Sequence, residues 1–343
     1  MEKIVIHSYG GYDKLKLEQA ETPSPGENEV LVENRAVGVN YADVTVRWGL
    51  YESAKKYVGL PITPGFEFAG VIKALGKNVE NISVGQKVFG VTFFNGYSSR
   101  LCVPQHQVYP MPSSLTFEQA AGVPAVFLTA YYALFENFIF RKGSKVLVHS
   151  AAGGVGSSLV QMAKINKCQV TGVVGSSHKV ETVKNLGADF VIDKSSVDLW
   201  SEVEKISPSG FDVILDANGV STLKGSYNHL APMGKLVCYG FHSMLPKKGG
   251  KINWIKLGID YLRTIRFNPL DMTNENKSII TFNLSFLFSQ EELLRRCMEQ
   301  IGIWFEEGKL VAPPITTYAL KDVAKAHRDL ESGKTVGKLV LIP

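Results

Sequence analysis

The sequence predicts an α/β protein with two domains, one mostly antiparallel β and one built on a doubly wound parallel sheet. Three observations predict this. The chain has 343 residues, more than one hydrophobic core usually organises. Residues 1–110 read as short strands separated by Gly and Pro. From about residue 115, apolar Val, Ile and Leu strands alternate with helices, a pattern typical of a parallel sheet covered on both faces.

The predicted N-terminal domain begins with short apolar segments. "EVLVENRAVGVN", "AGVIKALG" and "VGQKVFGV" alternate or run apolar over short spans, as strands do. The segment "ETPSPGEN" at 21–28 is rich in chain-breaking residues and predicts a turn, and "YADVTVRWG" predicts a helix. We expect this β domain over residues 1–124, completed by residues 286–343, where the sequence returns to mixed α and β.

The second domain is expected over residues 125–285. It follows "TFEQAAGVPAVFLTAYYALFENF", which is apolar at helical spacing, with Thr116 as a candidate N-cap and Glu118 in the first turn. Strands are then predicted at "KVLVHSA", "QVTGVVG", "FVID", "FDVILDA" and "KLVCYG", with helices over 155–166 and 178–186 between them. This order predicts a parallel sheet.

Composition narrows the class of protein. The hydrophobic fraction is 45% and the charged fraction 20%, as in ordinary globular proteins. The N-terminus has no signal-peptide pattern, and no apolar run approaches the roughly 18–20 residues that span a bilayer, so we expect a soluble, cytoplasmic protein. The net charge of +5 is modest, and we expect no nucleic-acid partner. The four cysteines lie far apart, which suits a reducing compartment: Cys102, Cys168, Cys238 and Cys297.

The segment "KVLVHSAAGGVGSSLVQMAK" carries the most informative motif. A strand leads into Ala151-Ala152-Gly153-Gly154-Val155-Gly156, and a helix begins at once. This matches the dinucleotide-binding pattern, with Ala151 in place of the first glycine. Gly153 permits close approach of a pyrophosphate, and Gly156 permits close packing of helix on strand. Free N–H groups at the helix start would bind the phosphates.

The end of the next strand favours NADPH over NADH. An NAD site usually carries an acidic residue about 20 positions after the glycine motif, where it binds the ribose 2′-hydroxyl. Here "GSSHK" follows Gly175, and no acidic residue occurs before Glu181. Ser176 can donate to a 2′-phosphate and Lys179 can neutralise it, with Lys194 as a second cation.

These motifs together resemble the medium-chain dehydrogenase/reductase superfamily. "PGFEFAGVIKALGKNV", "VGQKVFG", "AAGVPAVFLTAYYAL", "AAGGVG" and "LGADFVID" are similar to its zinc-independent quinone oxidoreductase (zeta-crystallin-like) branch. "RFNPLDMTNENKSIITFNLSFL" is similar to the VAT-1 subgroup of that branch. The resemblance covers essentially the whole chain. It implies a GroES-like β domain, a Rossmann domain and a homodimer.

The residues at the family's metal-ligand positions predict that no zinc is bound. Zinc-dependent members use a Cys, a His before a Glu, and a Cys or Asp. Here the first position is Asn40 and the second is Phe66 in "ITPGFEFAG", while "GVPAVFLTAY" near the third offers no thiol or carboxylate. A catalytic zinc needs three protein ligands. The four-cysteine lobe of some relatives is also missing, and the seven His residues show no ligand spacing.

Without a metal, reduction of a quinone or an α,β-unsaturated carbonyl is the expected chemistry, because charge spreads onto a stabilised oxygen that hydrogen-bond donors can support. The resemblance implies that Asn40 lies beside nicotinamide and substrate, that Tyr51 in "GLYES" is a donor, and that Thr129 lies near the carboxamide. Thr45 stands where relatives of this branch often carry Tyr, which puts substrate binding in doubt. Asp43 and Glu67 are expected to be structural, bonding backbone or a lysine.

Further cofactor contacts are expected where parallel strands end, because ligands bind at the carboxyl edge of such sheets. Asn218-Gly219 and Gly240-Phe241 follow two of the predicted strands. Phe282 and Asn283 resemble the family's dimer strand, whose end approaches the nicotinamide. The expected cofactor-binding residues are Asn40, Thr129, Ala152, Gly153, Gly154, Val155, Gly175, Ser176, Lys179, Lys194, Asn218, Gly240, Phe241 and Phe282.

Residues 243–267 combine an apolar stripe with basic residues. Ile252, Ile255, Ile259 and Leu262 recur at helical spacing, and Trp254 adds an aromatic residue. Such a stripe can lie on an anionic membrane surface. We favour the alternative that it packs on the protein's own core as a lid or packing helix.

Two classes of function remain. The first is an NADPH-dependent oxidoreductase acting on a small-molecule quinone or enone. The second is a nucleotide-binding protein with little turnover, a VAT-1-like sensor or membrane-associated partner. The cofactor motif and Asn40 favour the enzyme, whereas Thr45 favours the second class. We favour the enzyme, since function is decided by sites rather than by the fold.

Overall fold

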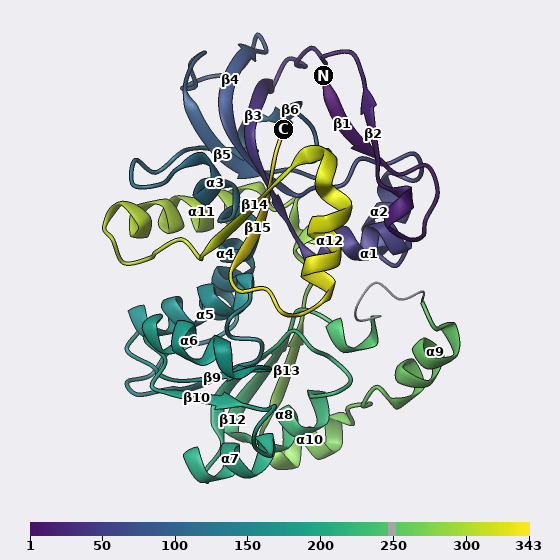
Figure 1. Cartoon of the computed structure of the whole chain (residues 1–343). Helices are drawn as coiled ribbons and strands as arrows, with labels where there is room; N and C mark the ends of the chain where they lie inside the picture. Colours follow the sequence, from purple (N-terminus) through teal and green to yellow (C-terminus); the bar gives the residue numbers. More distant parts are fainter. Residues whose placement is uncertain (246–251) are drawn as a thin grey trace. The chain divides into compact units, whose positions relative to one another are not determined.

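The computed structural model describes residues 1–245 and 252–343, and the chain forms two compact units. Unit 1 comprises Met1–Leu128 and Ser285–Pro343, and unit 2 comprises residues 129–245 and 252–284. In Figure 1, unit 1 is drawn in purple and blue and, for its C-terminal segment, in yellow-green to yellow, and unit 2 is drawn in teal and green. The α/β class predicted from the sequence is confirmed.

Unit 1 is built on a mostly antiparallel sheet. In the described residues its strands follow the order β14-β15-β3-β4-β5-β7, with β6 also paired to β3. Only the pair β14 and β15 is parallel among these neighbours. This is the GroES-like β domain. The strands are β3 (Glu29–Val39), β4 (Glu67–Leu75), β5 (Lys87–Val91), β6 (Arg100–Pro104), β7 (Val108–Pro110), β14 (Ile315–Ala319) and β15 (Lys338–Ile342).

Short helices and a hairpin complete unit 1. The helix predicted at "YADVTVRWG" is confirmed as α1 (Tyr41–Trp48). The long helical segment is divided at Pro124, which starts a new helix because proline lacks the N–H of a helix interior. Thr116 caps the first of the two helices through Gln119 N, as predicted. The other elements are β1 (Glu2–Val5), β2 (Lys16–Gln19), α2 (Glu52–Tyr57), α3 (Phe117–Ala121), α4 (Pro124–Tyr131), α11 (Glu291–Glu306) and α12 (Val323–Glu331).

Unit 2 contains the parallel sheet. Its described strands follow the order β10-β9-β8-β11-β12-β13, and every neighbouring pair is parallel. Numbered along the chain this is 3-2-1-4-5-6, the order of the doubly wound dinucleotide-binding fold, whose ligands bind where the order reverses. That point lies between β8 and β11. The strands are β8 (Lys145–Val148), β9 (Gln169–Val174), β10 (Phe190–Asp193), β11 (Phe211–Asp216), β12 (Leu230–Cys238) and β13 (Ser278–Thr281).

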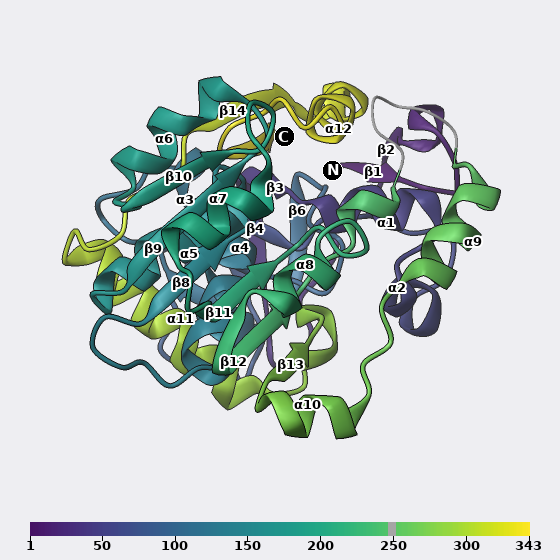
Figure 2. The ribbon, with the colours of Figure 1, turned by 90° about the horizontal axis from the view of Figure 1, so that it is seen from below.

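Helices connect and cover these strands. α5 (Gly154–Ile165) packs on β8 and β9, and α6 (Val180–Asn185) packs on β10. α7 (Leu199–Ile206) contacts β10, and α8 (Leu223–Asn228) contacts β11 and β12, as Figure 2 shows from below. The sheet is apolar on both faces. Leu147, Ile214 and Leu236 lie in register on one face, and all three are completely buried. Val148, Leu215 and Val237 lie in register on the other face, and they are completely buried too. This arrangement places the strand ends, and the loops that follow them, at one edge.

Two further helices belong to unit 2, and the first of them, α9, corrects one prediction. α9 (Trp254–Arg263) and α10 (Pro269–Glu275) bury none of their described residues. The stripe was expected to pack on the protein's own core. Instead Trp254 is 65% exposed, and Ile255 and Leu262 are exposed by more than two thirds. Figure 1 shows α9 well apart from the strands of its own unit.

No helix in the parts of the chain that the structure describes is both long and apolar enough to cross a bilayer.

Candidate functional site

The glycine turn lies between β8 and α5. Gly153 is the N-cap of α5, and its N–H donates to Ser150 O at 2.9 Å. A Cβ on Gly156 would lie 2.2 Å from Ser150 O, so only glycine fits where the helix meets the turn. A Cβ on Gly153 would meet only that same oxygen, at 3.3 Å. Gly153, Gly154 and Val155 are half-buried, whereas Ala152 is buried. The turn therefore offers backbone N–H groups to an anion.

The turn after β8 is tied to the loop after β11. Ser150 Oγ donates to Asn218 Oδ1 at 3.0 Å, and Asp216 Oδ1 accepts the N–H groups of Asn218 and Gly219. These bonds direct Asn218 towards the carboxyl edge. Asn218 is 8% exposed, and its Nδ2 has no hydrogen-bond partner among the described residues. A buried donor without a partner costs free energy, so this amide fits a ligand that accepts its proton.

The loops after β9 and β10 bring together the residues expected at a 2′-phosphate. Gly175 and Ser176 follow β9, and Lys194 follows β10. A Cβ on Gly175 would lie 3.7 Å from Lys194 Cε, so this cation lies beside the turn. Lys179 is half-buried, and that burial lowers the pKa of its ammonium group. A bound anion would offset this cost.

The loops after β12 and β13 lie at the same edge. His242 N donates to Ala217 O, which links the loops after β11 and β12. Phe241 packs against Gly219, where a Cβ would lie 2.6 Å from Phe241 Cδ1. Phe282 directly follows β13, and its ring lies 4.8 Å from that of Tyr132. Gly240 and Thr129 are half-buried, Thr129 on α4.

In unit 1, the side chain of Asn40 is held by two charged residues. Asn40 Nδ2 donates to Glu67 Oε1 at 2.8 Å, and Asn40 Oδ1 accepts from Lys338 Nζ at 2.5 Å. Lys338 also pairs with Glu67 at 2.6 Å, and Glu67 Oε2 accepts the N–H of Ala125 at 2.8 Å. Glu67 was expected to bond backbone or a lysine, and it bonds both.

Asp43 bonds the backbone next to the Asn40 side chain. Its carboxylate accepts the N–H groups of Asn40 and Gly65, each at 2.8 Å, which confirms the structural role expected of it. Complete burial raises the pKa of Asp43 to about 7. Tyr97 lies beside Asp43, and its hydroxyl is 3.1 Å from His327 Nε2. The buried Asp43 carboxylate therefore holds the backbone at Asn40 and at Gly65.

Aromatic residues surround Tyr51. Its ring meets those of Phe66 and Phe94 edge-on, at 5.5 and 6.4 Å between centroids. Phe66 is buried in this cluster, so the position of the family's metal-binding His is an apolar packing position. Thr45 Oγ1 donates to Ala42 O at 2.7 Å, and this hydroxyl therefore bonds its own helix. Phe66 directly precedes Glu67, which connects Tyr51 to the Asn40 group.

In residues 1–245 and 252–343, no group of three His, Cys, Asp or Glu side chains could hold a metal ion.

Lys338 was not found from the sequence. It lies 298 positions from Asn40 and reaches it only because β15 pairs with β3, with Leu339 opposite Val39. A lysine in the strand "GKLVLIP" reads as an ordinary solvated residue, yet Lys338 is 3% exposed. The only signal was Glu67, which as a buried carboxylate predicts a cationic partner of unknown position.

Comparisons with known proteins match the two-domain fold. A family model described as alcohol dehydrogenase GroES-like domain matches residues 26–113, and one described as zinc-binding dehydrogenase matches residues 186–341. The synaptic vesicle membrane protein VAT-1 homolog of Rattus norvegicus is 34% identical over 343 residues, which is 99% of this chain and 83% of the relative.

Two solved structures match over nearly their full length. The Escherichia coli quinone oxidoreductase complexed with NADPH has a TM-score of 0.87 at 28% identity and 100% coverage of both chains. The CurK enoyl reductase has a TM-score of 0.86 at 28% identity, covering 99% of this chain and 98% of its own.

The chain belongs to the medium-chain dehydrogenase/reductase superfamily of oxidoreductases, as the resemblance implied. Within that superfamily its relatives include the VAT-1 homologs, and its structural neighbours include quinone oxidoreductases and an enoyl reductase.

Proposed function

We propose that this protein transfers hydride from NADPH to a quinone or an α,β-unsaturated carbonyl without zinc. The observation that supports this most is the partnerless, buried Nδ2 of Asn218 beside the glycine turn, at the point where the strand order reverses. The cofactor would supply the hydride. The E. coli neighbour is a quinone oxidoreductase with NADPH, and the CurK neighbour is an enoyl reductase.

Each half of the proposed reaction has its own residues. The N–H groups of Gly154 and Val155 would hold the pyrophosphate, Gly153 would allow its close approach, and Asn218 would donate to the cofactor. Ser176, Lys179 and Lys194 would hold the 2′-phosphate. Asn40 would donate through Nδ2 to the acceptor oxygen on which negative charge develops, and Tyr51 would contact the acceptor. In a reaction without a metal, this donor would stabilise the developing charge.

Turnover tests the proposal directly. NADPH oxidation is followed at 340 nm with 1,4-benzoquinone, 9,10-phenanthrenequinone and an alkenal, with and without EDTA. We expect turnover that survives EDTA and falls at least tenfold in Asn40→Ala, because a donor to the transition state is lost. Tight NADPH binding without turnover on every acceptor would contradict the enzyme and favour the nucleotide-binding alternative that Thr45 suggests.

Cofactor preference is tested by fluorescence titration of NADPH and NADH. Lys179→Ala should weaken NADPH by about tenfold and leave NADH nearly unchanged, because only NADPH carries the 2′-phosphate. Lys184→Ala, an exposed lysine on α6, is the matched control and should change neither. Equal weakening of both cofactors would contradict the assignment of Lys179.

We also propose a homodimer, as the resemblance implies. β13 is one of the two edge strands of the described sheet of unit 2, the other being β10, so its outer side is available for pairing. Sedimentation that shows a stable monomer at micromolar concentration would contradict this.

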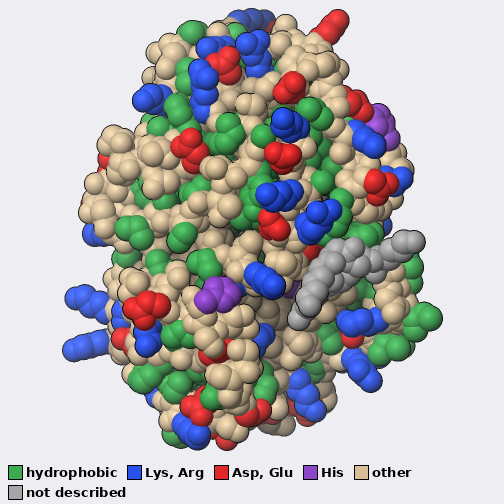
Figure 3. Space-filling view, viewed as in Figure 1, with side chains coloured by type: hydrophobic (Ala, Val, Ile, Leu, Met, Phe, Trp, Pro, Cys, Tyr) green, Lys and Arg blue, Asp and Glu red, His purple; other side chains and the backbone are tan. Residues whose placement is uncertain are grey.

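The exposed face of α9 favours a second function, contact with an anionic membrane surface. Trp254, Ile255, Ile259 and Leu262 lie on one side of this helix and are all exposed. Figure 3 shows hydrophobic and basic side chains close together in this region. Basic residues strengthen the binding of such helices to anionic membrane surfaces. The described part of this segment carries Lys256, Arg263 and Arg266. Lys247, Lys248 and Lys251 of the predicted basic segment lie outside the described residues.

Co-sedimentation with liposomes tests this second function. We expect binding to phosphatidylserine-containing liposomes at low salt, weaker binding to neutral ones, and loss of binding in an Ile255→Ser/Leu262→Ser variant. Val84→Ser removes a similarly exposed apolar side chain of unit 1 and should leave binding intact. Absence of binding to anionic liposomes would end the idea.

A further inference from the structure

Asn40, Glu67 and Lys338 form a closed ring of hydrogen bonds inside unit 1. Glu67 Oε1 accepts from both Asn40 Nδ2 and Lys338 Nζ, and Lys338 Nζ also donates to Asn40 Oδ1. Each of the three side chains therefore contacts the other two. The two charged members are almost completely buried, with Glu67 at 0% and Lys338 at 3% exposure.

The charges on either side determine which way the Asn40 amide faces. A carboxylate only accepts hydrogen bonds, and an ammonium group only donates them. Rotating the amide by half a turn would place Oδ1 against the Glu67 carboxylate and Nδ2 against the Lys338 ammonium. Both contacts would then be repulsive, in a region where burial strengthens electrostatic interactions. The amide therefore has one orientation.

The ring is itself held by bonds to several helices and strands. Glu67 begins β4, and its second oxygen accepts from Ala125 N in the first turn of α4. Lys338 begins β15, which pairs with β3. Asn40 follows β3, and its backbone N–H is bonded to Asp43. Movement of the amide would break bonds to several elements at once.

We propose that Lys338 and Glu67 are positioning residues that hold the Asn40 amide ready for the acceptor. The amide nitrogen carries two protons, and Glu67 takes one of them. Asn40 is half-exposed, so the second proton is available to a bound molecule. A donor that is already oriented gives up little freedom when charge develops on the acceptor oxygen. This inference rests on the proposed function only for the identity of the bound oxygen.

The orientation can be measured without turnover. The protein is labelled with ¹⁵N-asparagine, and the Asn40 side-chain resonances are assigned by their loss in Asn40→Ala. In the wild type, the proton bonded to Glu67 should exchange with solvent at least tenfold more slowly than the second proton. In Lys338→Met this difference should shrink to about threefold or less, because the amide then loses one of the two charged partners that hold its orientation. Lys338→Arg keeps a cation and should retain most of the difference.

Lys73→Met is the matched control, since Lys73 pairs with Glu33 in the same unit but is 40% exposed. It should leave the Asn40 resonances unchanged. Two Asn40 protons that exchange at the same rate in the wild type overturn the proposal, and this outcome needs no variant to fold. Unchanged Asn40 protons in a folded Lys338→Met overturn it as well.

Kinetics then separate positioning from a merely structural role. Lys338→Met should lower kcat about tenfold with little change in the KM for NADPH. In an Asn40→Ala background the same substitution should lower kcat less than twofold, because the residue it positions is gone. Equal losses in both backgrounds would make Lys338 structural and overturn the proposal. If the wild type turns over no acceptor, the proposed function fails, and proton exchange alone decides the positioning.

Discussion

The two units bury their polar groups in different ways. In unit 1, Arg47 pairs with Glu331 at 2.9 Å with both side chains completely buried, and Lys338 pairs with Glu67. In unit 2, the buried Asp216 is satisfied by neutral donors, which are Ser226 Oγ at 2.9 Å and two backbone N–H groups. Its neighbour His149 lies 3.0 Å from Ser226, and burial lowers the pKa of that imidazole to about 4.

The comparison shows which interactions hold the buried polar groups of each unit in place. Unit 1 also has a buried carboxylate with neutral donors, Asp43, but it adds ion pairs that join segments remote in sequence, since Arg47 and Glu331 are 284 positions apart. Unit 2 uses hydrogen bonds within the loops of one sheet edge, and Asp216 and Ser226 are 10 positions apart. Removing one partner of a buried ion pair leaves an unpaired buried charge and costs a large free energy of unfolding. Removing one partner of a neutral hydrogen bond costs less. The two units should therefore respond differently to mutation and to pH.

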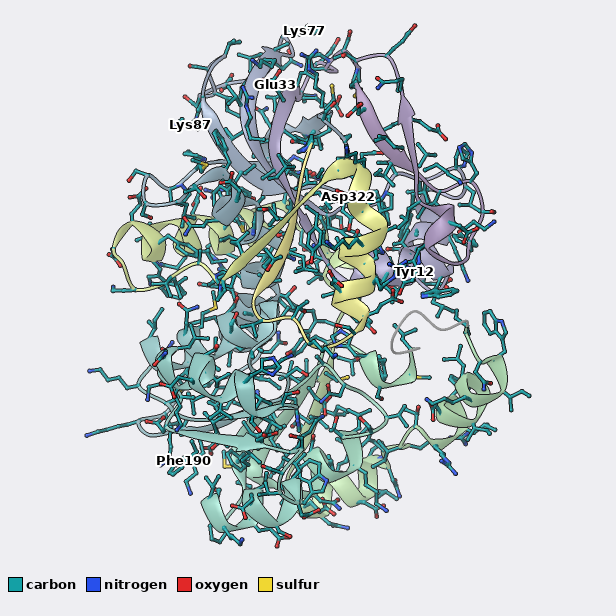
Figure 4. All side chains as sticks on the ribbon, in the orientation of Figure 1. Tyr12, Glu33, Lys77, Lys87, Phe190 and Asp322 are labelled. Carbon is teal, nitrogen blue, oxygen red and sulfur yellow. The ribbon has the colours of Figure 1, made fainter. Side chains whose placement is uncertain are left out.

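The largest effect is expected at Arg47. Its guanidinium bonds Glu331 and lies 4.4 Å from the centre of the Tyr12 ring, and Figure 4 shows Tyr12 beside α12. Arg47→Met leaves the Glu331 carboxylate buried and unpaired, which should lower the free energy of unfolding by roughly 3–5 kcal/mol. Chemical denaturation measures it. Arg295→Met removes an exposed arginine that also has two ion pairs, and should have little effect. Similar losses for both would contradict the comparison.

Asp43 should give unit 1 a stability that falls as pH rises. Its folded pKa of about 7 lies above the usual value of 3.8, so between about pH 4 and 7 the folded state binds more protons than the unfolded state. The native state should lose about 3 kcal/mol over this window. The free energy of unfolding is measured against pH for the wild type and for Asp43→Asn. The difference between the two profiles isolates the contribution of Asp43. A difference that does not change with pH would contradict it.

His149 should give unit 2 the opposite slope. Its folded pKa of about 4 lies below the usual 6.5, so between these values the unfolded state binds more protons and stability rises with pH. The gain should be between about 2 and 3 kcal/mol, and His149→Gln should remove it. Burial also lowers the pKa values of His242 and His327, so the wild-type profile sums several contributions and only the variants separate these two. Difference profiles, wild type minus variant, that slope in the same direction for Asp43→Asn and His149→Gln would break the comparison.

The smallest effect is expected at Ser226. Ser226→Ala removes one donor from Asp216 but leaves the two backbone N–H groups, and should cost about 1–2 kcal/mol. Ser201 also donates its hydroxyl to an aspartate, Asp198, on the exposed surface. Ser201→Ala is therefore the control and should cost less. A loss at Ser226 as large as that at Arg47 would show that unit 2 depends on its buried cluster as unit 1 does.

The parts of the fold that are local in sequence could be predicted. The turn from Ala151 to Gly156 requires a strand before it and a helix after it, and all three features lie within about 20 residues. Alternation of strands and helices likewise predicted the parallel sheet. The cap at Thr116 depends on a residue three positions away, and it too was found.

The rest could not be predicted, because it depends on which distant segments meet. Nothing near Asn40 indicates that a lysine of β15 binds its amide. In α9 the sequence indicates the helix itself, because the spacing of its apolar residues predicts an amphipathic helix. That spacing does not indicate what covers the apolar face. The structure leaves that face exposed, whereas the sequence favoured packing on the core.

The pairing of β3 with β15 has a consequence for synthesis of the chain. At about 5–20 residues per second, a ribosome needs roughly 15–60 s to travel the 298 positions from Asn40 to Lys338. During that time all of unit 2 is made, while the edge of β3 at residues 37–39 is unpaired and Glu67 lacks its cation. Open strand edges invite association with other chains. A nascent chain stalled before β15 should therefore be a stronger substrate for chaperones than the finished protein.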